Sequence, residues 1–148
     1  MPSPIDELKQ SKEHLFDLFS KGKITETFEE DYTEIVDQYF RKSLQENTTA
    51  ERLFTKKRPF ALVALGGYGR KELCYHSDID IMVLFKNGIP AAAANMAEDM
   101  FFPLWDIGLE LGHATRDIRD CLTLSTHDFV VFTSLWTHVS SEATHPSI

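Results

Sequence analysis

The stretch ALVALGGYGRKELCYHSDIDIMVLF, residues Ala61 to Phe85, decides how this chain folds. It starts with a run of five apolar residues that ends at Gly66 and Gly67, and a second apolar run comes after a short polar segment. The first run has no polar alternation and is bounded by Pro59 and the glycines, which is typical of a strand covered on both faces. We therefore expect a strand, a tight turn, a short helix and a second strand.

Two aspartates stand at the start of the second apolar run. Successive strand residues point to opposite faces, so Asp78 and Asp80 share one face and their α-carbons lie roughly 6.5 Å apart. Two like charges beside an apolar strand are costly unless something neutralises them. Mg²⁺ is a hard ion that takes one or two carboxylates and completes its shell with water and substrate phosphates. The pattern therefore predicts Asp78 and Asp80 as Mg²⁺ ligands.

The glycines between the two runs predict the second part of the same site. Gly66, Gly67 and Gly69 allow a sharp turn and a close approach to a ligand, and the amides that open the next helix would face an anion. A Walker A loop is excluded because Lys71 and Glu72 stand where that loop has Gly and Lys, and Glu72 also breaks the dinucleotide fingerprint. The pattern predicts a nucleoside triphosphate between a glycine turn and a metal ion.

These residues carry a family resemblance. GGYGRKEL and SDIDIMVLF resemble the nucleotidyltransferase domain of the uridylyltransferases that modify the PII nitrogen-signalling protein, within the DNA polymerase beta superfamily. The likeness is nearly residue for residue over Ala61 to Leu84, and PLWDIGLELGH, from Pro103 to His113, also resembles the next segment of that family. The resemblance implies an α/β (α+β) nucleotidyltransferase fold, a short mixed sheet flanked by helices and preceded by a helical pair.

The resemblance also implies roles for particular residues. Asp78 and Asp80 would bind Mg²⁺, and Gly66, Gly67 and Ser77 would contact the nucleotide phosphates. The implied reaction transfers a nucleotidyl group from a nucleoside triphosphate, UTP in that family, to a protein hydroxyl such as a tyrosine of PII.

Arg70 lies in the glycine turn and is the remaining candidate for nucleotide binding. Its guanidinium either contacts a phosphate or pairs with a carboxylate of the protein, and the residues favour neither role.

Length and composition are those of one globular domain. The 148 residues are 43% hydrophobic and 26% charged, which is ordinary for a folded chain. Pro4 to Phe19 has the periodicity of an amphipathic helix, and a second helix is expected to begin at Thr25 or Thr27, where Thr27 and Glu30 fit a capping box. Residues 1–50 are therefore predicted to be a helical segment packed on a nucleotidyltransferase core, residues 51–148.

Further elements are expected after the central stretch. The pattern predicts a helix over Pro90 to Phe102, a third strand over Leu109 to Thr115, and short helices over Asp117 to Leu124 and His127 to Leu135.

A third carboxylate of the superfamily is expected in a segment resembling Leu-Asp-Ala-Arg after Leu135, but WTHVSS stands there. Codons for WTHVSS, read one nucleotide earlier, can encode Leu-Asp-Ala-Arg. We therefore hypothesise a frameshift and a chain truncated at its C-terminus. Glu110, Asp117 or Asp128 could instead supply the missing carboxylate.

Charge and hydropathy exclude other classes of function. A net charge of -8 argues against nonspecific binding to nucleic acid, which needs a basic surface. Cys74 and Cys121 are too few and too far apart for a zinc site or a disulfide framework. No apolar run suits a signal peptide or a membrane span, so we expect a cytoplasmic protein.

Three functional hypotheses remain. The first is a nucleotidyltransferase that uses Mg²⁺ and a nucleoside triphosphate. The second is a catalytically incomplete nucleotide-binding or regulatory module that lacks the third carboxylate. The third is a small transferase of the toxin-antitoxin type that uses ATP on another protein.

Overall fold

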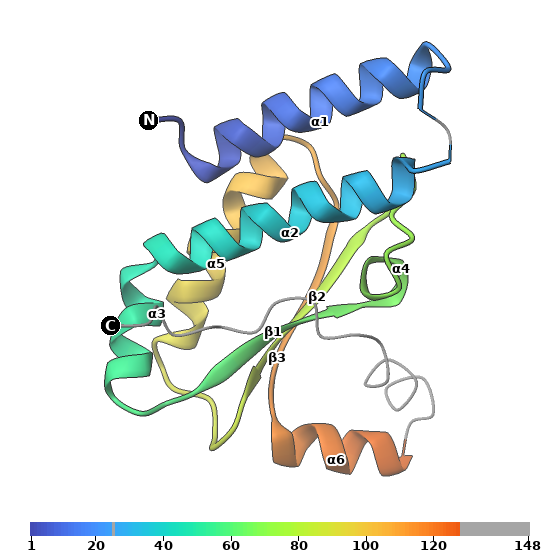
Figure 1. The fold of residues 1–148 in the computed structure, drawn as a ribbon. Helices are drawn as coiled ribbons and strands as arrows, with labels where there is room; N and C mark the ends of the chain where they lie inside the picture. The colour runs from blue at the N-terminus through green and yellow to red at the C-terminus, as the bar shows by residue number, and fades with distance from the viewer. Residues whose placement is uncertain (25, 128–148) are drawn as a thin grey trace.

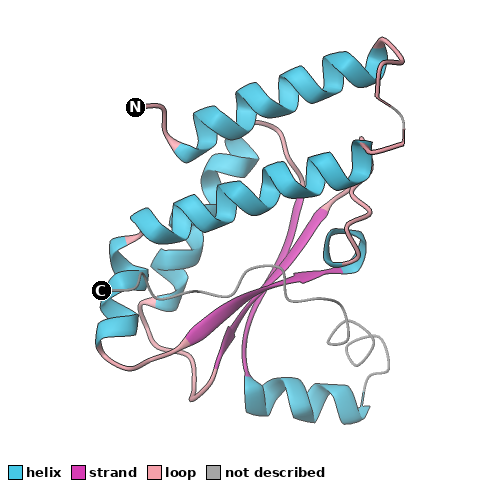
Figure 2. Ribbon diagram, in the orientation of Figure 1, coloured by secondary structure: helices cyan, strands magenta, loops and turns pink. Residues whose placement is uncertain are grey.

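A computed structural model describes residues 1–24 and 26–127 (Figures 1 and 2). Its elements in chain order are α1 (Pro4–Ser20), α2 (Phe28–Glu46), α3 (Thr48–Thr55), β1 (Phe60–Leu65), α4 (Gly66–Gly69), β2 (Ile79–Phe85), α5 (Ala93–Asp106), β3 (Leu111–Asp117) and α6 (Ile118–His127). The predicted α/β class, with a short mixed sheet flanked by helices and preceded by a helical pair, is confirmed.

The sheet has the order β1-β2-β3. β1 runs antiparallel to β2, with Leu65 opposite Asp80, whereas β2 runs parallel to β3, with Asp80 opposite Gly112. The end of β1, the start of β2 and the start of β3 therefore meet at one end of the sheet. The glycine turn α4 begins at this end.

The two faces of the sheet are covered differently. One face packs into the main hydrophobic core with residues from α1, α2, α3 and α5, and its strand residues include Leu62, Ala64, Ile79, Ile81, Val83 and Phe85. The other face carries a smaller cluster of Val63, Met82 and Cys121, the last from α6. Because side chains alternate along a strand, Asp80 lies on this second face, two residues before Met82.

The N-terminal helices lie over the first face, with α1 packed along α2 (Figure 1). α1 begins with a capping box in which the Ser3 hydroxyl accepts from the Asp6 amide and the Asp6 carboxylate accepts from the Ser3 amide. The capping box predicted for α2 is wrong, because the Thr27 hydroxyl donates instead to the Asp31 carboxylate at 2.9 Å. Residue 25, the other predicted start, lies outside the described residues.

A helix that sequence patterns did not predict begins one residue after α2. Asn47 ends α2, and its Oδ1 accepts from the Ala50 amide at 2.9 Å, which caps the first turn of α3. The polar residues 45–49, whose composition suits either a frayed helix end or a loop, therefore form a direct connection between two helices. α5 also differs from its prediction, since it begins at Ala93 and continues through Pro103 to Asp106.

β3 begins and ends two residues later than predicted, and α6 continues through residues 125–127, where a helix break was expected. The rest of the helix predicted to end at Leu135, and the segment WTHVSS, lie outside the described residues. Within residues 1–24 and 26–127, no helix is long and apolar enough to cross a membrane. The predicted boundary between residues 1–50 and 51–148 stays a prediction, although both parts contribute to the main core.

Candidate nucleotide site

The carboxylate of Asp80 lies between two glycines, at the end of the sheet where β1 ends and β2 and β3 begin. A Cβ atom added to Gly112 would come within 2.3 Å of Asp80 Oδ1, and one added to Gly66 would come within 3.0 Å of Oδ2. Gly66 also has a φ of 55°, a left-handed conformation that side chains rarely adopt. The two missing side chains therefore leave room for the carboxylate of Asp80, which is directed at the glycine turn.

Asp78 precedes β2 and is exposed, while Asp80 is half-buried. Burial raises the pKa of the Asp80 carboxyl above its ordinary value of 3.8, and the negative charge of Asp78 raises this pKa further. The two aspartates are thus close enough for their charges to interact. A cation between them would relieve both costs, the lost hydration of Asp80 and its repulsion by Asp78.

The glycine turn is closed by backbone hydrogen bonds. The amides of Arg70, Lys71 and Glu72 donate to the carbonyls of Gly66, Tyr68 and Gly67 at 3.2, 3.1 and 2.8 Å, respectively. The first amides of any helix have no partner within that helix, so the start of α4 offers donors to a ligand near Asp80. A Cβ atom at Gly67 would lie 3.4 Å from the Glu72 carbonyl oxygen, which is van der Waals contact.

The loop from α4 to Asp78 is held at two points. The Ser77 hydroxyl accepts from the Cys74 amide at 2.8 Å, and the Ser77 amide donates to the Cys74 carbonyl at 3.2 Å. The Tyr75 ring stacks on the Phe16 ring of α1, with 4.4 Å between centroids. Ser77 is half-buried beside Asp78, and its hydroxyl proton is able to donate to a phosphate oxygen.

Arg70 is exposed and pairs with Glu72. Its Nε donates to Glu72 Oε2 at 2.9 Å, and both side chains are about half exposed. The structure therefore shows the carboxylate pairing that was one of the two alternatives for this residue. Because an exposed ion pair contributes at most about 1 kcal/mol, a phosphate can compete with Glu72, and a nucleotide contact by Arg70 stays a prediction.

The candidates for a third carboxylate differ in how near they lie to Asp80. Asp117 pairs with Phe85, five residues beyond the pairing of Asp80 with Gly112, so it lies roughly 16 Å from the site along the strand. Its Oδ1 instead accepts from the Asp120 amide at the start of α6. Glu110 is nearer, because its carbonyl accepts from the Ile79 amide at 3.0 Å, and its side chain is exposed. Asp128 lies outside the described residues.

The donor set fits Mg²⁺ better than a metal that needs a full protein shell. Among the described residues, no three His, Cys, Asp or Glu side chains are grouped so as to hold a metal ion. Mg²⁺ is commonly held by one or two carboxylates with water and substrate phosphates as its other ligands. Asp78 and Asp80, beside a turn that admits a phosphate, match this description.

Sequence reasoning missed two features of the site. Gly112 forms one wall around Asp80, and the available signal was a glycine inside a predicted strand, which often marks a close approach. Asp37 is a buried residue of α2 that accepts a hydrogen bond from Tyr68 of the glycine turn. Its signal was a carboxylate placed next to Val36 in the apolar stripe of α2.

Comparisons with known proteins agree with the geometry. The profile of the nucleotidyltransferase family DUF294 matches residues 9–112. The bifunctional uridylyltransferase/uridylyl-removing enzyme of Hydrogenovibrio crunogenus is 37% identical over 130 residues, 86% of this chain and 14% of the relative. The enzyme of the same name from Ralstonia nicotianae is 34% identical over 133 residues, 90% of this chain and 15% of the relative.

A shorter match, to the bifunctional uridylyltransferase/uridylyl-removing enzyme of Cereibacter sphaeroides, is 39% identical over 84 residues, 57% of this chain and 9% of the relative. This chain thus spans less than a sixth of the length of these curated relatives. No solved structure matches it significantly. The resemblance seen in the glycine and aspartate motifs is therefore confirmed at the level of the family.

Proposed function

Because the chain belongs to the DUF294 nucleotidyltransferase family, we propose that it binds a nucleoside triphosphate with Mg²⁺ and transfers the nucleotidyl group to a protein hydroxyl. The observation that supports this most is the position of the Asp80 carboxylate, which lies between Gly66 and Gly112 and within the electrostatic influence of Asp78. A partly desolvated carboxylate at the glycine turn is suited to meet a triphosphate through a shared metal ion.

The proposal gives each group a role. Asp78 and Asp80 hold Mg²⁺, which neutralises phosphate charge and orients the triphosphate when it is bound. The backbone at Gly66 and Gly67 and the hydroxyl of Ser77 bind phosphate oxygens. The acceptor hydroxyl loses its proton to water as its oxygen forms a bond to the α-phosphorus. The bond from that phosphorus to the oxygen that bridges to the β-phosphate breaks, and pyrophosphate leaves.

UTP is the nucleotide we propose, because the curated relatives are named uridylyltransferases. The resemblance of the glycine and aspartate motifs to the PII-modifying family makes a tyrosine of PII the proposed acceptor. The described side chains around Asp80 give no contact that distinguishes uracil from adenine, so ATP is the necessary comparison in any assay.

A second candidate is a nucleotide-binding or regulatory module without transfer activity. The observation in its favour is that the residues described by the structure place no third carboxylate beside Asp78 and Asp80. Calorimetry with Mg²⁺ and UTP, together with transfer of label from α-³²P-UTP to a PII acceptor, distinguishes the two. Binding with transfer supports the enzyme, and binding without transfer supports the module.

The aspartates provide the direct test of the site. Asp78→Asn and Asp80→Asn should each lower Mg²⁺-dependent UTP affinity by about 100-fold or more, because each removes a carboxylate from the metal. Calorimetry with and without Mg²⁺ measures the change. Asp99→Asn, at an exposed aspartate of α5, is the matched control and should bind as the wild type does. Unchanged affinity in Asp80→Asn would contradict the proposed site.

A further inference from the structure

The four-residue helix α4, which forms the glycine turn, has one side chain that can hold it in place. α4 consists of the four residues GGYG, so Tyr68 is its only residue with a side chain. Glycines give the chain conformational freedom, and a turn made of them needs an anchor if it is to present a single geometry. Tyr68 is 1% exposed, and its ring packs against Phe40 of α2.

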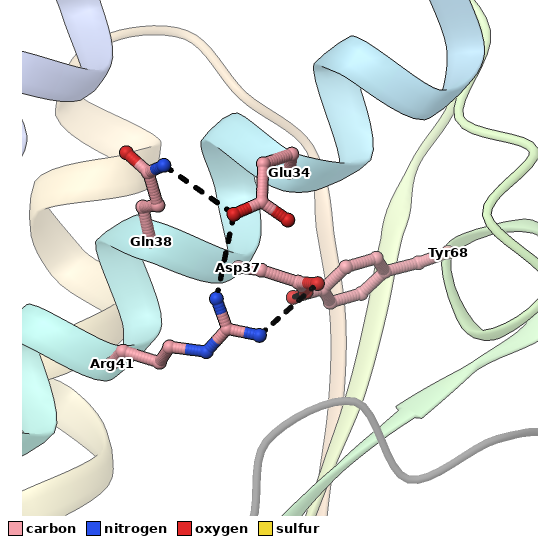
Figure 3. A network of polar contacts seen from close by, with 5 residues as sticks. All are labelled: Glu34, Asp37, Gln38, Arg41 and Tyr68. Carbon is pink, nitrogen blue, oxygen red and sulfur yellow. Dashed lines mark hydrogen bonds and ion pairs between the residues drawn. The ribbon is translucent and has the colours of Figure 1, made fainter.

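The polar end of Tyr68 reaches a buried carboxylate. The Tyr68 hydroxyl donates to Asp37 Oδ1 at 2.6 Å, and Asp37, on α2, is 3% exposed (Figure 3). The bond joins residues 31 positions apart in the chain. A hydrogen bond this short is directional, so it orients the tyrosine ring as well as burying it.

The carboxylate of Asp37 is itself held by its own helix. Arg41, one turn further along α2, lies 4.0 Å from Asp37 Oδ2 and donates to Glu34 Oε1 at 3.5 Å (Figure 3). Gln38 donates to the same Glu34 oxygen at 3.3 Å. Arg41 thus gives the Asp37 carboxylate a cationic neighbour at Oδ2, while Oδ1 accepts from Tyr68.

Burying such a group does not in general add stability. Removing a carboxylate from water is costly, and apolar replacements of buried ionic groups are often neutral or stabilising. The Tyr68 ring would pack in the same place without its hydroxyl, so packing alone does not call for Asp37. What the pair supplies is a defined position for Tyr68, and hence for Gly66 beside Asp80.

We propose that Asp37 is a positioning residue of the nucleotide site: through its hydrogen bond with Tyr68 it holds the glycine turn in place beside Asp80. The inference rests on the function proposed above. It assigns a role in nucleotide binding to a residue of the N-terminal helices that does not touch the ligand.

The test compares two buried tyrosine hydroxyls. Tyr68→Phe should weaken Mg²⁺-dependent UTP binding by about ten-fold, the effect of losing one buried hydrogen bond. Tyr39→Phe is the matched control, because Tyr39, on α2, is 3% exposed and donates to the Met100 carbonyl, away from the turn. It should leave UTP affinity unchanged. An equal loss in both variants would overturn the proposal.

Variants of Asp37 separate positioning from folding. Asp37→Asn keeps an oxygen that accepts from Tyr68 and should retain most of the affinity, whereas Asp37→Leu should lose about as much as Tyr68→Phe. The double variant Asp37→Leu/Tyr68→Phe should lose less affinity than the two single losses combined, because both variants break the bond that joins Asp37 to Tyr68. Losses that multiply in the double variant would overturn the proposal, and thermal unfolding of each variant checks that it is folded.

A measurement without nucleotide keeps this inference separate from the proposed function. Amide hydrogen exchange at Arg70, Lys71 and Glu72, whose bonds close the turn, should be faster in Tyr68→Phe than in Tyr39→Phe. If the wild type does not bind Mg²⁺ and UTP, the proposed function is wrong. If amide exchange in Tyr68→Phe equals that in Tyr39→Phe, the proposal that Asp37 and Tyr68 hold the glycine turn is wrong as well. Faster exchange with normal UTP affinity would overturn the role in binding.

Discussion

The two faces of the sheet differ in what they cover. The face under α2 and α5 is closed by apolar side chains, and Ile81 at its centre is 1% exposed. Among the described residues, the opposite face has only a small cluster, and Leu65, Leu84 and Ala114 around it are partly buried. Asp80 is on this more open face, next to two glycines. One face therefore stabilises the fold, while the other leaves space around a carboxylate.

The largest expected effect is on the closed face. Ile81→Ala should lower the free energy of unfolding by about 2–5 kcal/mol, because a buried side chain is lost and a cavity remains. Leu84→Ala, on the opposite face of the same strand, should cost less than about 2 kcal/mol because Leu84 is only partly buried. Urea denaturation measures both. Equal losses in the free energy of unfolding would mean that the two faces contribute equally to stability, contrary to this prediction.

A smaller effect is expected at the glycines, on binding instead of stability. Gly112→Ala places a methyl group 2.3 Å from Asp80 Oδ1, so the carboxylate must move, and Mg²⁺-dependent UTP affinity should fall about ten-fold or more. Gly88→Ala is the control: its φ is 73° with open space around it, so it should cost about 1 kcal/mol of stability and leave binding unchanged. Calorimetry and urea denaturation distinguish the two. Normal binding by Gly112→Ala would show that this wall around Asp80 is not needed.

The smallest expected effect is on stability, and it comes from the charge of the half-buried Asp80 carboxylate. Burial, and then the charge of Asp78, raises the pKa of Asp80, so the folded state holds this proton more tightly than the unfolded state does. Ionisation therefore lowers stability as the pH rises from the ordinary 3.8 through the folded pKa, and the loss remains at neutral pH. Asp80→Asn should raise the Tm of the metal-free protein at pH 7 by on the order of a degree or two.

This small gain has two controls. The difference in Tm between Asp80→Asn and the wild type should shrink as the pH falls toward 3.8, where the wild-type carboxyl is also protonated. Adding Mg²⁺ should raise the Tm of the wild type but not that of the variant. A lower Tm for Asp80→Asn at pH 7 would mean that the carboxylate stabilises the fold, contrary to the role given to the open face.

Sequence patterns predicted the parts of the fold whose causes are local. The first strand was expected from Ala61 and begins at Phe60, and the glycine turn and β2 lie where the motif predicted them. α3 was missed because its start depends on one side chain, Asn47, that caps a helix directly after another helix ends. The polar composition of residues 45–49 resembles a loop, and only the geometry at Asn47 shows the direct connection between the two helices.

The site was predicted in part, for the same reason. Asp78, Asp80 and the glycine turn could be named because they lie within 15 residues in one motif. Gly112 and Asp37 could not be assigned to it, since each reaches the site from a distant element. A glycine in a strand and a carboxylate on an apolar stripe are visible in the sequence, but each has many structural explanations.

Local sequence patterns were enough to predict the strand-turn-strand unit, the glycine turn, and the family to which the motif belongs. The tertiary structure alone decided that Gly112 lies against Asp80 and that Asp37 meets Tyr68. The physical reason is that hydrophobic periodicity and turn chemistry act over a few residues of backbone. Strand register and helix packing depend on surfaces that come together only when the whole core is formed.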